Sequence, residues 1–417
     1  MKTLLILYEN GGAGHKRTAQ LVESMLAGED GWGSVVVAGS ELFNDSSILL
    51  INWLWNVLVR KNWIALADWL LNFQLRAWIL PLMEATGLAA CHARLDEVKP
   101  DAIICTADGY AKALGLYAEE RSIPLYIVIT EFTMFADLAN PAATHICYFP
   151  ETINAIRSYR FEETYFSQRL NRSSSVLERM RYVAGVYKDR MAAGGARSIY
   201  RNINTQHPDT NQANCIAVGP IVDPAYYSRA DKHRLREKLG IDAHKPCALV
   251  ISGSIGGEYL NEVVTTFQNG WHEAVTLVVA CGRDRGSYRK VAACARRTAG
   301  VEVIPMGFCD AMPELYAAAD VVIARPSASV FLEALMQHVP ILIPQRATAN
   351  DLGGAELIKK HHLGRVYRGR QDLLDSFGQI VQRHQQHVDG ICRFLAAFPT
   401  DFDTQRKTIA SIVYGPR

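Results

Sequence analysis

The 417-residue chain carries little net charge, no long hydrophobic run and no closely paired cysteines. A formal charge of +2 gives no overall reason to bind nucleic acid. The nine cysteines form no C-x-x-C pair, which excludes a zinc knuckle or a disulfide framework and indicates a reducing, cytosolic environment. The apolar run before Glu9 is only five to six residues, too short for a signal-peptide core, and it predicts a first buried strand.

The segment 42–95 is rich in tryptophan but has no uncharged run long enough to span a membrane. Its longest uncharged run, 46–59, has 14 residues, fewer than the roughly 20 that a membrane-spanning helix needs. The segment nevertheless holds five of the seven tryptophans, and Trp favours the lipid headgroup level. We therefore predict peripheral contact with the anionic inner face of the cytoplasmic membrane, through Trp53, Trp55, Trp63, Trp69, Arg60 and Lys61. The alternative is a buried helix pair or a dimer interface.

A second unusual segment is 157–201, which contains ten Arg or Lys residues against four Asp or Glu. We predict that it is a helical insertion. Such a charge run is either a solvated helix face or an additional attraction to anionic lipid headgroups.

Elsewhere, apolar strands alternate with amphipathic helices, which predicts an α/β fold with parallel sheets. The length exceeds what one hydrophobic core usually serves, so two Rossmann-like domains are expected. We place them at 1–220 and 221–395, with a C-terminal helix in 396–417 that crosses back to the first. The predicted strands are 3–8, 34–38, 102–106, 125–130 and 145–149, then 247–252, 275–281, 301–305, 321–324 and 341–344.

Residues 324–344 carry the clearest chemical signal and read ARPSASVFLEALMQHVPILIP. A helix that opens on small and hydroxyl residues can hold a pyrophosphate on its backbone N–H groups. A carboxylate one or two turns later, here Glu333, can accept hydrogen bonds from ribose hydroxyls. The pattern is therefore typical of a nucleotide-sugar site.

A glycine-rich turn follows the first predicted strand and includes Gly12, Gly14 and His15, before a helix from about Ala19. Glycines allow close approach of a ligand, and the positive end of a helix dipole favours a neutral imidazole that can act as a base. The alternative is a structural turn in which His15 caps or packs. Asp108, at another strand end, is either a catalytic carboxylate or a helix cap.

Four ordered motifs resemble glycosyltransferases of the family that includes monogalactosyldiacylglycerol synthases and bacterial diacylglycerol glucosyltransferases. They are GGAGHKRTAQLVESML (11–26), SGSIGGEYLN (252–261), GFCDAMPELYAAAD (307–320) and the run at 324–344. The chain is more distantly similar to the enzyme that adds N-acetylglucosamine to a lipid-linked muramyl-pentapeptide. The resemblance implies a GT-B fold, in which two Rossmann-like domains face each other across a cleft.

The resemblance also implies roles for individual residues. A UDP-sugar would be a co-substrate of the C-terminal half, with no cofactor or metal, since no Asp-x-Asp accompanies the donor motifs. Its contacts would come from Gly253, Ser254, Gly256, Gly257, Phe308, Ser327, Ala328, Ser329, Glu333, Asn350 and Asp351. Independently of the resemblance, Arg283 lies at a strand end of this half and is either a phosphate contact or a solvated loop arginine. The N-terminal half would hold a lipid or lipid-linked acceptor at the loop of Gly12 and Gly14, with His15 serving the acceptor hydroxyl.

The chain departs from the family pattern in two places. Ser327 and Ala328 stand where the family commonly has two glycines, and Glu131 stands where it has an aspartate, without the histidine that follows there. Glu131 is therefore a candidate catalytic carboxylate. The alternatives are transfer to a soluble acceptor, a UDP-sugar 2-epimerase, or a non-catalytic lipid- or partner-binding relative.

Overall fold

The chain forms two compact units in a computed structural model of the protein. The first comprises Met1–Trp55, Ala65–Ile221 and Asp403–Arg417, and the second comprises Asn56–Ile64 and Val222–Phe402. The structure describes residues 1–9, 14–28, 31–43, 47–107, 109–159, 170–192, 194–195, 199–202, 212–253, 257–295 and 300–415.

The first unit is built on a six-stranded parallel sheet in the order β2-β1-β3-β4-β6-β8. Its strands are β1 (Lys2–Tyr8), β2 (Trp32–Ala38), β3 (Ala102–Cys105), β4 (Leu125–Ile129), β6 (Ala143–Cys147) and β8 (Asn214–Ala217). The five strands predicted for this half are confirmed within a few residues. β8 was not predicted, nor was the antiparallel pair β5 (Thr133–Phe135) and β7 (Tyr200–Asn202).

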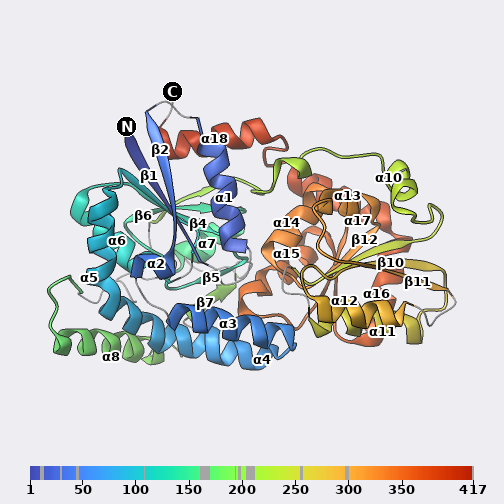
Figure 1. Ribbon diagram of the computed structural model, residues 1–417, viewed down its shortest axis with the longest axis horizontal. Helices are drawn as coiled ribbons and strands as arrows, with labels where there is room; N and C mark the ends of the chain where they lie inside the picture. The colour runs from blue at the N-terminus through green and yellow to red at the C-terminus, as the bar shows by residue number, and fades with distance from the viewer. Residues whose placement is uncertain are drawn as a thin grey trace. The chain divides into compact units, whose positions relative to one another are not determined.

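Helices cover this sheet, and the chain returns to it at its C-terminal end (Figure 1). They are α1 (Gly14–Leu26), α2 (Gly39–Phe43), α5 (Leu80–Val98), α6 (Ala111–Arg121), α7 (Pro150–Arg157), α8 (Val176–Ala192) and α18 (Phe402–Tyr414). α18 lies beside β2, where the rings of Tyr414 and Trp32 are 4.8 Å apart, and Tyr126 Oη donates to the Ile412 carbonyl at 3.0 Å. A helix thus lies within the predicted range 396–417 and packs against the first sheet.

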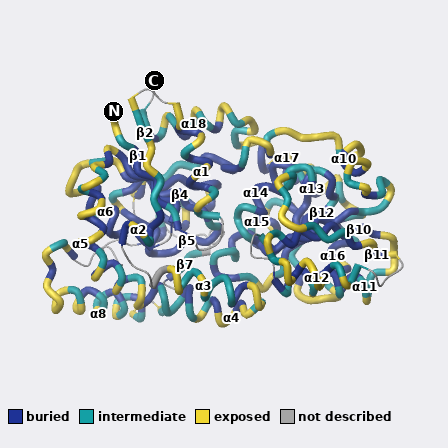
Figure 2. The backbone as a smooth tube through the Cα atoms, viewed as in Figure 1, coloured by how far each residue is buried: buried dark blue, intermediate teal, exposed yellow. Residues whose placement is uncertain are grey.

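The second unit holds another six-stranded parallel sheet, in the order β11-β10-β9-β12-β13-β14. Its strands are β9 (Cys247–Ile251), β10 (Val275–Ala280), β11 (Val301–Met306), β12 (Val321–Ala324), β13 (Ile341–Pro344) and β14 (Gly364–Tyr367). The first five were predicted. Four of them, β9, β10, β12 and β13, are nearly continuous buried apolar runs, as expected for strands covered on both faces, whereas the edge strand β11 exposes Glu302 (Figure 2).

Helices alternate with these strands, giving the doubly wound arrangement expected from the sequence. They are α10 (Lys232–Leu239), α11 (Glu258–Gly270), α12 (Arg285–Cys294), α13 (Met312–Ala318), α14 (Ala328–Met336), α15 (Leu352–His361), α16 (Arg370–Gln382) and α17 (His384–Leu395), with short 3-10 turns η3 (Pro224–Tyr226) and η4 (Ala349–Asp351). Phe377 packs edge to face against Phe267 and Trp271 at ring distances of 5.0 and 5.1 Å, which joins α16 to α11.

The sequence predicted that the whole Trp-rich segment belongs to the first domain, but part of it belongs to the second unit. It forms α3 (Ser47–Arg60), α4 (Ile64–Ala67) and a π-helix η1 (Asp68–Ile79) before α5. Asn56–Ile64 cluster with the second unit instead. The reason is polar contact with α11 and with the N-cap residue of α12, because Asn62 donates to Glu262 at 3.1 Å and Arg60 lies 3.8 Å from Asp284.

Candidate functional site

The predicted acceptor-side residues of the first unit gather at the carboxyl edge of its sheet. β1 and β3 are neighbours, and β2 extends the sheet on one side while β4 extends it on the other. Ligands of open parallel sheets bind at such a reversal of strand order. α1 begins at Gly14, earlier than predicted, so His15 lies in the first helical turn after β1. Gly12 lies outside the described residues.

His15 is held by the residues that follow the two neighbouring strands. Its Nδ1 lies 2.7 Å from the carbonyl of Thr106, after β3, and 3.0 Å from Thr130 Oγ1, after β4. Thr106 Oγ1 also donates to the main-chain carbonyl of His15 at 3.0 Å. A carbonyl can only accept, so the contact assigns the ring proton to Nδ1. Nε2 then carries the lone pair and can accept a proton.

The sequence did not single out the two threonines that orient His15. Thr106 and Thr130 are ordinary strand-end residues, and their role depends on β3 and β4 lying side by side. Glu131, the next residue after Thr130, is half-buried at the same strand end. The described partners of the His15 ring are the two threonines rather than Glu131. Asp108 lies outside the described residues.

A second buried group at this edge was also not predicted as part of the site. Glu9, directly after β1, accepts hydrogen bonds from Tyr110 Oη at 2.5 Å and from Asn52 Nδ2 at 2.9 Å. Tyr110 packs so closely on Gly39 that a Cβ there would lie 2.3 Å from its ring. This network connects the end of β1 to α3 and to the start of α6.

In the second unit, the predicted donor residues follow the strands on both sides of another reversal of strand order. β9 lies between β10 and β12, and the chain progresses outward from it in both directions. The connection 252–257, here called the glycine loop, follows β9, and α14 begins after β12. These two connections therefore meet the requirement for a ligand site at a switch point.

The glycine loop has a backbone that only glycine readily adopts. Gly253 has φ +62° and Gly257 has φ +105°. Gly257 N–H donates to Ser287 Oγ at 3.1 Å, and Ser287 Oγ donates to Asp284 Oδ2 at 2.8 Å. Asp284 also caps α12, accepting from Gly286 N–H at 3.0 Å, so the loop is fixed to a helix start. Ser254 and Gly256 lie outside the described residues.

The second donor element is the start of α14. Ser327 is its N-cap residue, and Ser327, Ala328 and Ser329 are half-buried there. Glu333 lies in the second turn of the helix and is buried. The helix thus presents free N–H groups and the positive end of its dipole, with a carboxylate one turn further on. This is the order of groups that a nucleoside diphosphate requires.

The remaining donor candidates follow the neighbouring strands. Arg283, after β10, places its guanidinium 4.5 Å from the centre of the Phe308 ring, after β11. Phe308 is largely exposed, so this pair offers a charged and an aromatic surface at the same sheet edge. Asn350 and Asp351 lie in η4 after β13, where Thr348 Oγ1 donates to Asp351 at 2.9 Å.

The Trp-rich segment is exposed to a degree unusual for tryptophan. Trp53, Trp63 and Trp69 are 60%, 56% and 55% exposed, whereas Trp55 is half-buried. Arg60 and Lys61 are also exposed, although Arg60 is paired with Asp284. Further exposed apolar residues of this region are Leu49, Leu50, Leu66, Trp78, Ile79 and Leu82. No helix of the described residues is both long and apolar enough to cross a bilayer.

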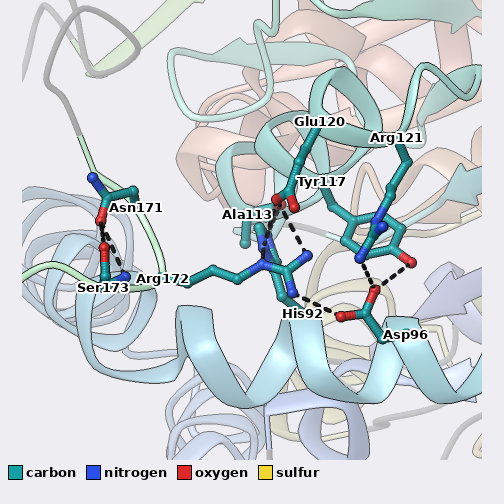
Figure 3. Close-up of polar contacts among 9 residues, drawn as sticks. All are labelled: His92, Asp96, Ala113, Tyr117, Glu120, Arg121, Asn171, Arg172 and Ser173. Carbon is teal, nitrogen blue, oxygen red and sulfur yellow. Dashed lines mark hydrogen bonds and ion pairs between the residues drawn. The ribbon is translucent and has the colours of Figure 1, made fainter.

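The basic insertion contributes α8 and β7, and part of its positive charge is used within the protein. Arg172 donates to His92 Nδ1 at 2.8 Å and to Asp96 at 2.7 Å, and lies 3.2 Å from Glu120 (Figure 3). Arg190 is buried. Part of the predicted basic run is therefore not solvated, because Arg172 holds the insertion against α5 and α6 and Arg190 is buried. At its N-terminal end, α8 exposes the apolar residues Val176, Leu177 and Met180 (Figure 2).

Comparison with known proteins supports the assignment of the second unit. Residues 247–372 match the model of the glycosyltransferase family 28 C-terminal domain. A UDP-N-acetylglucosamine–N-acetylmuramyl-(pentapeptide) pyrophosphoryl-undecaprenol N-acetylglucosamine transferase from Cutibacterium acnes is 29% identical over 34% of this chain and 40% of its own length. The chloroplastic monogalactosyldiacylglycerol synthase of Spinacia oleracea is 21% identical over 36% of the chain and 29% of its own length. The chain therefore matches less than half the length of these relatives.

Among solved structures, MurG of Acinetobacter baumannii matches over the full length of both chains, with a TM-score of 0.59 and 14% identity. At that identity the match shows the fold. With the two six-stranded parallel sheets, it confirms the predicted GT-B fold.

Proposed function

Since residues 247–372 of this GT-B chain match the model of the glycosyltransferase family 28 C-terminal domain, we propose that the protein transfers a sugar from a UDP-sugar to a hydroxyl group of a lipid or lipid-linked acceptor. The relatives that it matches include a transferase acting on a lipid-linked muramyl-pentapeptide and a galactolipid synthase. The acceptor class is carried over from those relatives, and the donor chemistry is supported by residues of the second unit.

The observation that carries the proposal is the meeting of two donor elements at one switch point. The loop bounded by Gly253 and Gly257 leaves β9, and α14 with Glu333 follows the neighbouring β12. Main-chain N–H groups of the loop and of the helix start stabilise the diphosphate, and Glu333 accepts hydrogen bonds from the ribose. The same N–H groups stabilise UDP as it leaves.

The proposed reaction needs a base for the acceptor hydroxyl, and His15 is the candidate. With its proton on Nδ1, fixed by Thr106, the ring offers Nε2 to the hydroxyl. The hydroxyl oxygen attacks the anomeric carbon, its proton passes to Nε2, and the bond between that carbon and the UDP oxygen breaks. Arg283 and Phe308 are proposed donor contacts, as are Asn350 and Asp351.

We also propose peripheral association with the cytoplasmic face of the membrane. Three tryptophans of the segment 42–95 have more than half of their surface exposed. Tryptophan at a membrane interface places an amphipathic ring at the headgroup level, and Arg60 and Lys61 next to it favour anionic lipid. The N-terminal end of α8 also exposes apolar side chains, at Val176, Leu177 and Met180, and we propose that they contact lipid as well.

The test measures UDP release from a panel of UDP-sugars, with and without liposomes made from a total lipid extract. We expect release that needs one UDP-sugar together with lipid. The variant His15→Ala should lose it, whereas His272→Ala, which removes an exposed histidine of the second unit, should not. Loss of general-base catalysis is worth about 10²–10⁴-fold in rate.

The outcomes separate the alternatives. Release that requires a water-soluble acceptor instead of lipid would replace the membrane acceptor but keep the enzyme. Conversion of a UDP-sugar without any acceptor would favour an epimerase. No turnover and no binding of UDP would refute the proposal and favour a non-catalytic relative.

A further inference from the structure

Arg325 is a buried arginine at the donor edge that the sequence motifs did not assign. It follows β12 and precedes Ser327, the N-cap residue of α14. Its relative exposure is 9%. Within the described part of the chain, its Nε and Nη1 atoms are buried without a hydrogen-bond partner, and so is Ser327 Oγ.

Such an arrangement is costly in the unliganded protein. A guanidinium carries five N–H donors, and buried donors in native proteins are almost always satisfied. Burial lowers the pKa of Arg325, and the nearby Tyr259, Asp351 and Glu262 oppose that shift. The guanidinium also lies 5.6 Å from the centre of the Tyr259 ring. The side chain is therefore held as a cation whose hydrogen-bonding capacity is only partly used.

We propose that Arg325 binds the diphosphate of the donor through its Nε and Nη1 groups, and that Asn62 positions its guanidinium. The inference rests on the proposed UDP-sugar function and deepens it. Two adjacent N–H groups of an arginine match two oxygens of a phosphate, which a lysine cannot reproduce. Arg325 follows β12, and β12 pairs with β9, the strand that the glycine loop follows. The arginine therefore lies at the same switch point of the sheet as the loop.

Asn62 is the second part of the inference, and it comes from the Trp-rich segment. Its Oδ1 lies 3.5 Å from Arg325 Nη2, at the outer limit of a hydrogen bond, while its Nδ2 donates to Glu262 at 3.1 Å. Glu262 lies on α11, which begins directly after the glycine loop. Asn62 therefore connects the arginine to the helix that carries that loop.

The neighbouring Arg60 fixes the same segment to the loop itself. A Cβ at Gly257 would lie 2.5 Å from the Arg60 carbonyl oxygen, so the two main chains are in direct contact. The Arg60 side chain lies 3.8 Å from Asp284, which holds Ser287 and through it Gly257. The segment 56–64 is thus a positioning element of the donor site rather than only a link between exposed tryptophans.

The backbone at Asn62 offers a clean way to test this role. Asn62 has φ +60°, a left-handed conformation in which glycine is at least as favourable. Asn62→Gly therefore removes the amide without straining the turn. Ser122→Gly is the matched control, since Ser122 has φ +53° at the end of α6 in the first unit.

The experiment titrates UDP by calorimetry and uridine by ligand-observed NMR into the full chain and its variants. The variants are Arg325→Lys, Arg325→Gln, Asn62→Gly and the control Ser122→Gly. Arg325→Lys keeps the positive charge but loses the paired N–H donors of the guanidinium. Arg289→Gln, on the exposed side of α12, controls for a lost positive charge. We expect both Arg325 variants to weaken UDP by about tenfold to a hundredfold, with uridine unchanged.

Asn62→Gly should weaken UDP by a smaller factor, about threefold to tenfold, because it misplaces the arginine without removing it. Both controls should bind as the unaltered protein does. Should Arg325→Gln fail to fold, Arg325→Lys and Asn62→Gly still decide the matter.

Three results would overturn the inference. UDP affinity unchanged in Arg325→Lys and Asn62→Gly refutes it while leaving the proposed function intact. Equal weakening of UDP and uridine shows a general structural defect and refutes the diphosphate contact. Failure of the unaltered protein to bind UDP at all refutes the proposed function and this inference together.

Discussion

Replacing Gly257 with alanine tests how tightly the glycine loop is packed. Gly257 has φ +105° and ψ −173°, a region that residues with a side chain almost never occupy. An added Cβ would lie 2.5 Å from the carbonyl oxygen of Arg60 and 2.9 Å from its Cα atom. Both are main-chain atoms, so the conflict cannot be relieved by rotating a side chain. Either the loop or the segment 56–64 must move.

Gly253→Ala provides the matched comparison, because Gly253 also has a positive φ, +62°, but no atom of the described residues lies within 4 Å of its would-be Cβ. Left-handed strain alone costs about 1–2 kcal/mol, and we expect that loss of stability for Gly253→Ala. Gly257→Ala combines backbone strain of about 1–3 kcal/mol with overpacking of about 1–3 kcal/mol, so we expect a loss of about 2–6 kcal/mol.

The two variants are compared by urea unfolding and by hydrogen exchange of peptides covering residues 56–64 and 257–270. Gly257→Ala should accelerate exchange in both peptides, because the contact between them is lost. Gly253→Ala should leave the peptide 56–64 as protected as in the unaltered chain. Equal stability and equal exchange in the two variants would refute the packing of segment 56–64 on the loop.

Three further predictions concern other parts of the molecule. Burial lowers the pKa of His145, which is 0% exposed, to about 4. The free energy of unfolding should therefore fall by about 3 kcal/mol as the pH drops from about 6.5 to about 4. In urea unfolding, His145→Gln should not show this loss. Asp137→Ala should cost about 3–5 kcal/mol of unfolding free energy, because Asp137 forms a buried ion pair with Arg76 at 2.5 Å. Glu333→Gln should raise the dissociation constant of UDP about tenfold while leaving unfolding nearly unchanged, because a charged acceptor for the ribose is lost.

Each of these has a result that would contradict it. Because the pKa of His145 is lower in the folded state than in the unfolded state, its contribution to the free energy of unfolding is present above about pH 6.5 and is lost as the pH falls. An unchanged pH profile in His145→Gln would show that other groups cause the acid loss. Asp137→Ala with near-native stability would mean that Arg76 finds an equivalent partner. Undiminished UDP affinity in Glu333→Gln would remove Glu333 from the ribose site.

The sequence by itself determined most of the sheet structure. Ten predicted strands, five in each half, are present within a few residues of their predicted ends. Most of them could be predicted because strands buried on both faces are continuous apolar runs, for which no pairing information is needed; the edge strands β2 and β11 are only partly buried. The missed strands β5, β7, β8 and β14 are three or four residues long, and β7 and β14 contain arginine, so their pairing depends on neighbours distant in sequence.

The tertiary structure alone decided which residues support the site. His15 could be recognised from a glycine-rich turn, but Thr106 and Thr130 orient it only because β3 and β4 lie next to each other. Arg325 stood within a recognised motif, yet nothing in that motif indicates that two of its nitrogens lack partners among the residues that the structure describes. Hydrogen bonding between distant segments has no local sequence signal, since it depends on how strands are ordered.

The Trp-rich segment shows the same division between what is local and what is not. Its tryptophan content and its lack of a spanning run are local properties, and they predicted a segment that does not cross a membrane. The attachment of residues 56–64 to the second unit depends on Asn62 reaching Glu262, which is 200 positions away in the chain. It also depends on the absence of a side chain at Gly257, which lies 197 positions after the Arg60 main chain that it contacts (257 − 60). Sequence periodicity predicts which face of a helix or strand is apolar, whereas the tertiary packing determines which other element that face contacts.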